Sequence, residues 1–175
     1  MSWWAKIEEP DPVLAKGDLL PDCLMPSFIE APIPLPNGEP SFADVKKARL
    51  IVMSQTCDLV NKKLEFVALC PVHRLAEFEE ANPNMRQKGC WERIRKGEQP
   101  ALHLIASPDF PNENRQALVV DFGHIVSVPV EYLSRHAVAM GERWRLTSPF
   151  LEYFSQAFAR FFMRVGLPSS IPPFK

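Results

Sequence analysis

The sequence lacks an excess of charge of either sign. It holds 20 Lys and Arg residues against 21 Asp and Glu residues, which leaves a formal net charge of −1 at pH 7. This balance excludes a generally basic protein that coats nucleic acid or an anionic membrane through charge alone. A local basic patch is still compatible with it.

Long apolar runs are also missing. No stretch approaches the roughly 20 apolar residues that a membrane-spanning helix needs, so we expect no membrane partner. The first residues, Met1 to Lys6, show no basic segment followed by an apolar run. We therefore expect no secretory signal and a cytoplasmic location.

Close cysteine pairs are absent as well. None of Cys23, Cys57, Cys70 and Cys90 forms a C-x-x-C pair, which favours free, buried thiols over disulfides. The nearest metal-ligand spacing is Cys70 to His73, but zinc sites usually combine two such pairs. The sequence predicts neither a metal site nor a cofactor.

Proline, by contrast, is abundant. The 175 residues, enough for a single domain over residues 1–175, include 18 prolines, and eight of these lie between Pro10 and Pro40. Because proline has no backbone N–H, residues 31–38 can be neither a helix nor a central strand. For residues 31–38, within a proline-rich extended segment of residues 10–40, we predict a polyproline loop that turns at Asn37–Gly38.

Apolar runs predict several short strands. Residues 49–54 form a continuous apolar run with a β-branched centre, which suits a strand buried on both faces. A polar loop at 55–63 separates it from a second apolar run at 64–70, as in an antiparallel hairpin. Further strands are expected at 13–20, 101–106, 116–121 and 124–128.

Three helices are predicted. Residues 84–97 form a basic helical insertion, and residues 129–140 form a helix that Gly141 ends. In the last helix, residues 148–166, Ser148 is the predicted N-cap and Pro149 the first helical residue. Five phenylalanines recur there at three- and four-residue steps as one apolar stripe. This stripe either packs on its own chain or joins in part a homodimer. The predicted fold class is mainly β with α decorations, in a small, strongly bent barrel.

Several segments resemble the MazF/PemK (Kid) family, the small SH3-like barrels of bacterial toxin–antitoxin systems. Lys16–Leu20 is similar to the opening strand of that family, and residues 48–54 with 64–72 resemble its hairpin. Residues 117–121 with 124–128 look like its later strands. The resemblance implies an SH3-like barrel. Ser54 to Leu59, which reads SQTCDL, also resembles a recurrent signature of uncharacterised bacterial proteins.

The resemblance implies an RNA-directed function. Members of the family commonly cleave single-stranded RNA without a metal, using an Arg from the hairpin region and a Thr or Ser from a later strand. Arg49 lies nearest the first position, whereas the later position falls near residues 99–103, which contain no hydroxyl. Single-stranded RNA and an antitoxin are the partners this implies. The alternative is a barrel without catalysis that binds proteins as a regulatory module, with Pro26–Pro40 as ligand or lid.

Four residues are candidates for catalysis. Arg49 would stabilise the charge that develops on a phosphate. Cys57, beside Asp58, would be a nucleophile if a histidine such as His103 or His73 activated it, and His103 would act as a general acid or base. The alternative is structural: Cys57 and Asp58 fold a tight loop, and His103 is a hydrogen-bonded histidine.

Two groups of residues are candidates for binding. Trp91 in the basic insertion would stack on a base, while its basic neighbours bind phosphates or an acidic partner. The alternative is a solvated helix face. The predicted binding residues are Ser54, Gln55 and Thr56 in the polar loop and Arg86, Trp91, Arg93 and Arg95 in the insertion.

Overall fold

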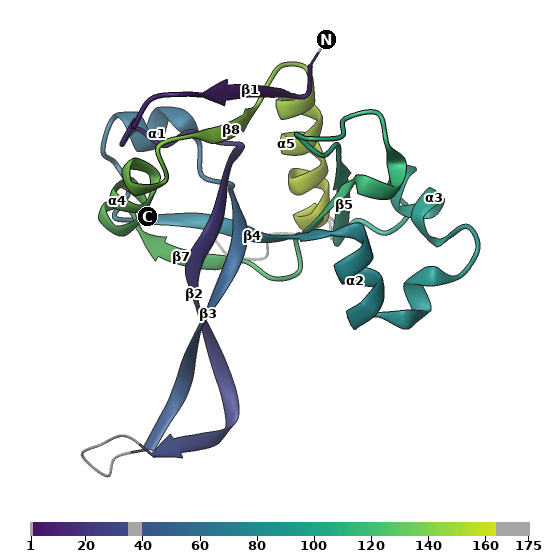
Figure 1. Cartoon of the computed structure of the whole chain (residues 1–175), viewed down its shortest axis with the longest axis horizontal. Helices are drawn as coiled ribbons and strands as arrows, with labels where there is room; N and C mark the ends of the chain where they lie inside the picture. Colours follow the sequence, from purple (N-terminus) through teal and green to yellow (C-terminus); the bar gives the residue numbers. More distant parts are fainter. Residues whose placement is uncertain (1, 35–39, 164–175) are drawn as a thin grey trace, which may run out of the picture.

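Strands dominate the computed structural model, which describes residues 2–34 and 40–163 (Figure 1). The strands are β1 (Trp4–Ile7), β2 (Asp18–Pro34), β3 (Pro40–Val52), β4 (Phe66–Arg74), β5 (Leu102–Ile105), β6 (Leu118–Asp121), β7 (Val126–Pro129) and β8 (Arg143–Leu146). The helices are α1 (Thr56–Val60), α2 (Leu75–Ala81), α3 (Cys90–Arg95), α4 (Val130–Met140) and α5 (Phe150–Phe162), with short 3₁₀ turns η1 (Pro83–Arg86) and η2 (Asn114–Gln116). The predicted class, mainly β with α decorations, is confirmed at this level.

The strands form one antiparallel sheet. Its order is β1-β8-β2-β3-β4-β6-β5, and β7 pairs with β4 beside this path. The predicted hairpin is confirmed, because β3 and β4 pair antiparallel from Leu50 opposite Pro71 to Val52 opposite Leu69. No helix in the described part of the chain is long and apolar enough to cross a membrane.

The end of the central strand β3, from Leu50 to Val52, is buried on both faces, as the apolar run predicts. Leu50 and Val52 join a core cluster with α4, whereas Ile51 and Met53 join a second cluster with α5. Successive residues of a strand point to opposite faces, so an unbroken apolar run needs a partner on each side. The two helices supply those partners.

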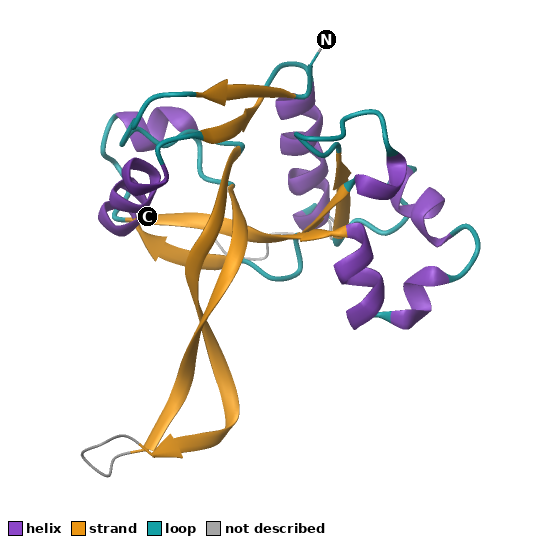
Figure 2. Ribbon diagram, viewed as in Figure 1, coloured by secondary structure: helices purple, strands orange, loops and turns teal. Residues whose placement is uncertain are grey.

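The β2–β3 hairpin extends beyond the body of the molecule as a two-stranded arm (Figure 2). Residues 31–34 belong to β2, with Ile33 opposite Ser41 and Pro34 opposite Pro40, so the predicted polyproline loop is wrong there. A two-stranded ribbon has a free edge on each side, where a residue without N–H loses no ladder bond. The predicted turn at Asn37–Gly38 lies outside the described residues.

Other boundaries also differ from the prediction. The insertion is two short helical pieces, η1 and α3, separated at Gly89, whose φ of 83° interrupts a helix. The expected strand at 13–20 begins only at Asp18, because Gly17 takes φ 85° in a turn. Strands β1 and β8 and helices α1 and α2 are present without having been predicted, and α1 lies within the predicted polar loop at 55–63.

The two C-terminal helices match their predictions closely. Gly141 ends α4 with φ 76°, and α5 covers Phe150–Phe162 with Pro149, rather than Ser148, at its N-cap. The apolar stripe of α5 packs on its own chain through the fully buried Phe154. Phe162 stays 59% exposed. Residues 164–166 lie outside the described part, and a dimer through this helix stays a prediction.

Candidate functional site

Arg49 lines a basic depression at the base of the arm. This cavity of about 350 Å³, here called the Arg49 hollow, adjoins a second one of about 370 Å³ through Pro21 and Arg49. The charged residues and the one histidine that line the Arg49 hollow are Asp22, Lys46, Lys47, Arg49, His73 and Glu77. Three cations face two carboxylates there, so the hollow carries a net positive charge when His73 is neutral.

A bulge in β2 opens this hollow opposite Arg49. Leu20 pairs with Leu50 and Cys23 pairs with Ala48, so Pro21 and Asp22 together oppose the single residue Arg49. Pro21 has no N–H for the ladder, and Asp22 takes a positive φ of 53°. Bulges of this kind interrupt pairing and redirect a side chain. The break in the ladder therefore leaves the Arg49 side chain room at the surface.

The cations of the Arg49 hollow form no ion pair within the described residues, although Asp22 and Glu77 line the same hollow. Among residues 2–34 and 40–163, no ion pair involves Lys46, Lys47 or Arg49. An unpaired cation at the surface is free to meet a phosphate, whereas a paired one must first lose its partner. This distinguishes the hollow from the basic insertion.

The basic insertion neutralises much of its own charge. Arg95 donates two hydrogen bonds to Glu92, at 2.7 and 2.6 Å, and Lys96 approaches the same carboxylate at 3.9 Å. Arg93 lies 3.9 Å from Glu98. Arg86 is exposed. The predicted phosphate-binding patch on this segment therefore has less free charge than its composition indicates.

Trp91 is held in place by hydrogen bonds. Its indole Nε1 donates to the Glu79 carboxylate at 2.7 Å, and Arg115 donates two bonds to the same carboxylate at 2.9 and 2.8 Å. Trp91, Arg95 and His103 line one cavity of about 510 Å³. The structure thus brings these three predicted residues together in one cavity, whereas Arg49 and Cys57 line other cavities.

His103 packs into the aromatic core. Its ring stacks on Phe122 with centroids 5.7 Å apart and an interplanar angle of 15°, and it also contacts Phe154. Burial lowers the pKa of His103 to about 4. His103 is therefore neutral at pH 7, and its surroundings resemble those of a core residue.

His73 is the histidine that shares a hollow with Arg49. Burial is the main cause that lowers the pKa of His73 below its ordinary value of 6.5; Arg49 and His124 lower it further, while Asp121 and Glu77 oppose the shift. The imidazole is therefore neutral at pH 7 and able to accept a proton. Its ring also contacts Phe78, with centroids 5.5 Å apart.

The SQTCD loop lines a third cavity, of about 410 Å³, which we call the Lys16 hollow. One side of it is formed by Gln55, Thr56 and Cys57, and Lys16 also lines it. The other wall is α5, through Leu151, Glu152, Ser155 and Gln156. The thiol of Cys57 is exposed and free.

The remaining loop residues have structural partners. Ser54 Oγ accepts a hydrogen bond from the backbone N–H of Ala68 at 2.9 Å, and Asp58 pairs with Lys63 at 3.5 Å. Cys57 and His103 line different cavities, and His73 lines yet another. The structure therefore does not assemble the cysteine–histidine pair that the sequence suggested.

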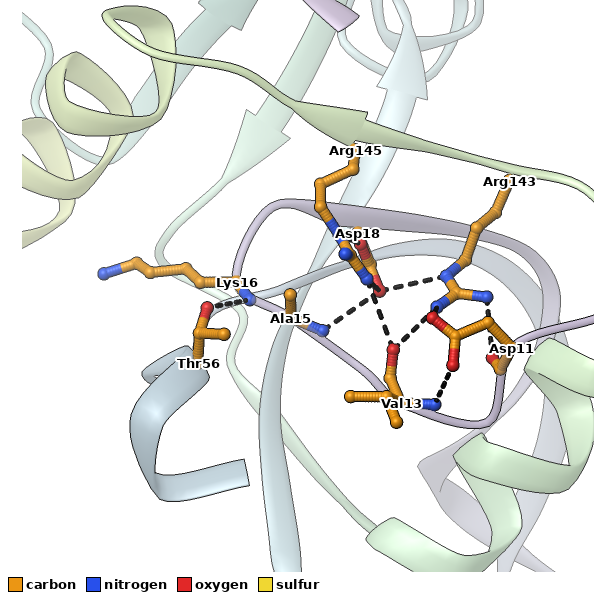
Figure 3. Close-up of polar contacts among 8 residues, drawn as sticks. All are labelled: Asp11, Val13, Ala15, Lys16, Asp18, Thr56, Arg143 and Arg145. Carbon is orange, nitrogen blue, oxygen red and sulfur yellow. Dashed lines mark hydrogen bonds and ion pairs between the residues drawn. The ribbon is translucent and has the colours of Figure 1, made fainter. Parts of the chain in front are cut away.

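A buried cluster around Asp18 was missed by sequence reasoning (Figure 3). Asp18 is fully buried and accepts bonds from Arg143 Nε at 3.0 Å, from Arg145 and from the backbone of Ala15. Arg143 also donates to the Val13 carbonyl at 2.7 Å. The alternation of Arg143 and Arg145 on one strand, which places both on one face, was the available signal.

Among the described residues, no three His, Cys, Asp or Glu side chains are arranged to hold a metal ion. Cys23 and Cys70 are buried, and burial raises the pKa of each thiol to about 12. Both are therefore protonated at pH 7, which makes them poor metal ligands.

No family model matches the chain, and no curated protein or solved structure is similar enough to it to count as a relative. The likeness to the MazF/PemK family therefore rests on the sequence segments quoted above.

Proposed function

We propose that this protein binds single-stranded RNA in the Arg49 hollow, as an SH3-like, MazF/PemK-type member of a bacterial toxin–antitoxin or defence system. The observation that carries the proposal is the set of unpaired cations, Lys46, Lys47 and Arg49, gathered around a β-bulge. RNA binding needs such free positive charge, because the phosphates supply most of the affinity. Because the overall charge is −1, affinity for phosphates has to come from a local patch such as this hollow.

The same hollow contains the groups for cleavage of RNA without a metal. In such a reaction the 2′-oxygen attacks the adjacent phosphorus and the bond to the 5′-oxygen breaks, which leaves a 2′,3′-cyclic phosphate and a 5′-hydroxyl. His73 takes the proton of the 2′-hydroxyl, and water supplies one to the departing 5′-oxygen. Arg49 offsets the charge on the phosphate oxygens through its planar fork of donors.

An RNA cleavage assay with matched arginine variants tests this proposal. Arg49→Ala should lower the cleavage rate about 100-fold or more, as the loss of a charge-stabilising group does. Arg93→Ala removes the same charge from a residue already near Glu98 and should change the rate little. Equal rates for both variants and the unaltered protein, or no cleavage of any single-stranded pool, would refute catalysis at Arg49.

The pH dependence of cleavage tests the role of His73. A base must be neutral to accept a proton, and the pKa of His73 lies below its ordinary value of 6.5. The rate should therefore stay level from pH 8 down to about 6.5 and fall only at lower pH, as the imidazole becomes protonated. His73→Gln should remove this acid limb together with most of the activity. A limb that survives in His73→Gln would assign the base to another group.

A non-catalytic, protein-binding module is the second candidate. The projecting arm favours it, because Leu24 and Val45 near its base are 44% and 58% exposed, and apolar side chains at an exposed site are typical of interfaces. An antitoxin encoded by a neighbouring gene should then form a complex with this protein. That complex should survive Arg49→Ala and should be lost in Leu24→Asp or Val45→Asp. If Arg49→Ala were the one variant that abolished the complex, the result would favour an RNA site in the Arg49 hollow.

A further inference from the structure

Lys16 is a buried cation without a counter-charge. The residue is only 6% exposed, and no carboxylate of the described chain lies within ion-pair distance of its ammonium. Lysine is almost never buried this far unless it is paired. Partial desolvation of the ammonium without a paired carboxylate costs stability.

The ammonium of Lys16 reaches the Lys16 hollow. Every fully buried side-chain nitrogen or oxygen of the described residues has a hydrogen-bond partner, and no hydrogen bond involves Lys16 Nζ, so this atom must have contact with solvent. The side chain lines the hollow, and Figure 3 shows it running away from the Asp18 cluster. Burial lowers the pKa of the ammonium, as the absence of a carboxylate leads one to expect.

The hollow around Lys16 offers several hydrogen-bond donors beside the ammonium. Thr56 Oγ1 accepts a hydrogen bond from the backbone N–H of Lys16 at 3.1 Å, which leaves the proton of the hydroxyl free to donate. The side-chain amides of Gln55 and Gln156 add N–H groups on opposite walls. The one acidic lining residue is Glu152, which is exposed. A charged donor surrounded by neutral donors matches an oxyanion.

We propose that the Lys16 hollow is a second site, distinct from the Arg49 hollow, that binds the phosphate or carboxylate group of a small molecule. Lys16 supplies the charge, and Thr56, Gln55 and Gln156 orient the oxygens. The cavity of about 410 Å³ has room for a ligand of small-metabolite size. This gives the SQTCD loop a binding role that needs no histidine.

Cys57 is a reporter placed inside the site. Its thiol is exposed in the hollow, whereas Cys23 and Cys70 are buried. In a Cys90→Ser chain, the rate of alkylation by neutral iodoacetamide therefore reports access to Cys57. Inorganic phosphate or acetate is added at constant ionic strength, and the dissociation constant is taken from the protection of the thiol.

Phosphate should protect Cys57, and Lys16→Met should weaken that binding about tenfold or more, the usual effect of losing a hydrogen bond from a charged donor. Lys62→Met removes an exposed lysine of the same loop and serves as the matched control, with no expected change. Glu152→Gln should strengthen binding. Circular dichroism checks the fold of each variant, and Gln156→Ala, which keeps Lys16, should weaken binding by a smaller factor.

The outcomes separate the alternatives. Protection by phosphate alone assigns a phosphate ligand, and equal protection by acetate assigns oxyanions in general. Absence of protection by either anion, or the same protection in Lys16→Met, overturns the proposal. Arg49→Ala should leave the protection unchanged, so failure of RNA binding at the Arg49 hollow and failure of this second site are distinguishable.

Discussion

Lys16 and Asp18 are two buried charges separated by one glycine, and among the described residues only Asp18 has partners of opposite charge. Asp18 is fully buried among two guanidinium groups and a backbone N–H. Lys16 is 6% exposed, and within the described chain its ammonium has no partner. Gly17 turns the backbone between them, so that one side chain enters the Asp18 cluster and the other the Lys16 hollow.

The comparison separates a charge used for structure from a charge kept for a ligand. Removing one partner of a satisfied buried pair leaves the others uncompensated, which is costly. Removing a buried charge that has no partner removes a desolvation penalty that already lowers the stability of the folded protein. Stability measurements on the two sides of Gly17 should therefore differ in size and in sign.

Asp18→Asn should have the largest effect. The substitution keeps the shape of the side chain and removes the charge that faces Arg143 and Arg145, so it should lower the free energy of unfolding by about 3–5 kcal/mol. Urea unfolding followed by circular dichroism measures this. Asp58→Asn, whose partner Lys63 lies 3.5 Å away and is exposed, should cost at most about 1 kcal/mol. Similar losses in both variants would contradict a structural role for Asp18.

Gly17→Ala should have the next largest effect. At φ 85°, an added Cβ would lie 2.9 Å from Leu146 Cβ and 3.0 Å from Leu151 Cδ1, so backbone strain and overlap together should cost about 1–3 kcal/mol. Gly89→Ala is the matched control, because Gly89 has φ 83° and nothing within 4 Å of the added Cβ. A larger loss in Gly89→Ala than in Gly17→Ala would refute the close approach.

Thr56→Val should have a moderate effect. It removes the acceptor of the 3.1 Å hydrogen bond from the Lys16 N–H while almost conserving volume, and should lower the free energy of unfolding by about 1 kcal/mol. Thr56→Ser keeps the hydroxyl and should restore most of this loss. If Thr56→Ser is as unstable as Thr56→Val, the methyl group, and not the hydrogen bond, joins the loop to Lys16.

Lys16→Met should have the smallest effect, and the opposite sign. It should leave stability at pH 7 equal to or slightly above that of the unaltered protein. Because burial lowers the pKa of Lys16 below its ordinary 10.5, the folded protein loses this proton before the unfolded chain does. The unaltered protein should therefore gain stability relative to Lys16→Met as pH rises towards 10.5. The titratable groups across the hollow, Cys57 and Glu152, are present in both proteins.

Urea unfolding of the two proteins side by side between pH 7 and pH 10 measures this difference. A constant difference would show that Lys16 titrates as it does in water. A marked loss of stability in Lys16→Met at pH 7 would mean that the charge stabilises the fold, and the contrast with Asp18 would disappear.

Much of the sheet could be predicted from local sequence. The runs at 49–54 and 64–70 give β3 and β4 because an unbroken apolar strand must be covered on both faces. The stripe of α5 could be predicted from its spacing for the same reason. Strands β1 and β8 were missed, because each is only four residues long and contains charged residues, and because their pairing joins segments far apart in the chain.

The candidate residues could be predicted in type but not in grouping. Arg49, Cys57, Trp91 and His103 carry suitable chemistry, yet the fold distributes them over three cavities. His73 was named only as a possible partner of Cys57, and its position beside Arg49 follows from the pairing of β3 with β4. Contacts between residues far apart in the sequence depend on strand register, which single residues do not reveal.

The sequence by itself determined the balance of charge, the apolar strands and the final helix, because composition and periodicity act over a few residues. Tertiary structure alone decided which charges are paired. Asp18 meets Arg143 and Arg145 across more than a hundred residues, while Lys16, two positions earlier, meets no opposite charge among residues 2–34 and 40–163. Pairing depends on what the fold brings near, and desolvation makes that difference large.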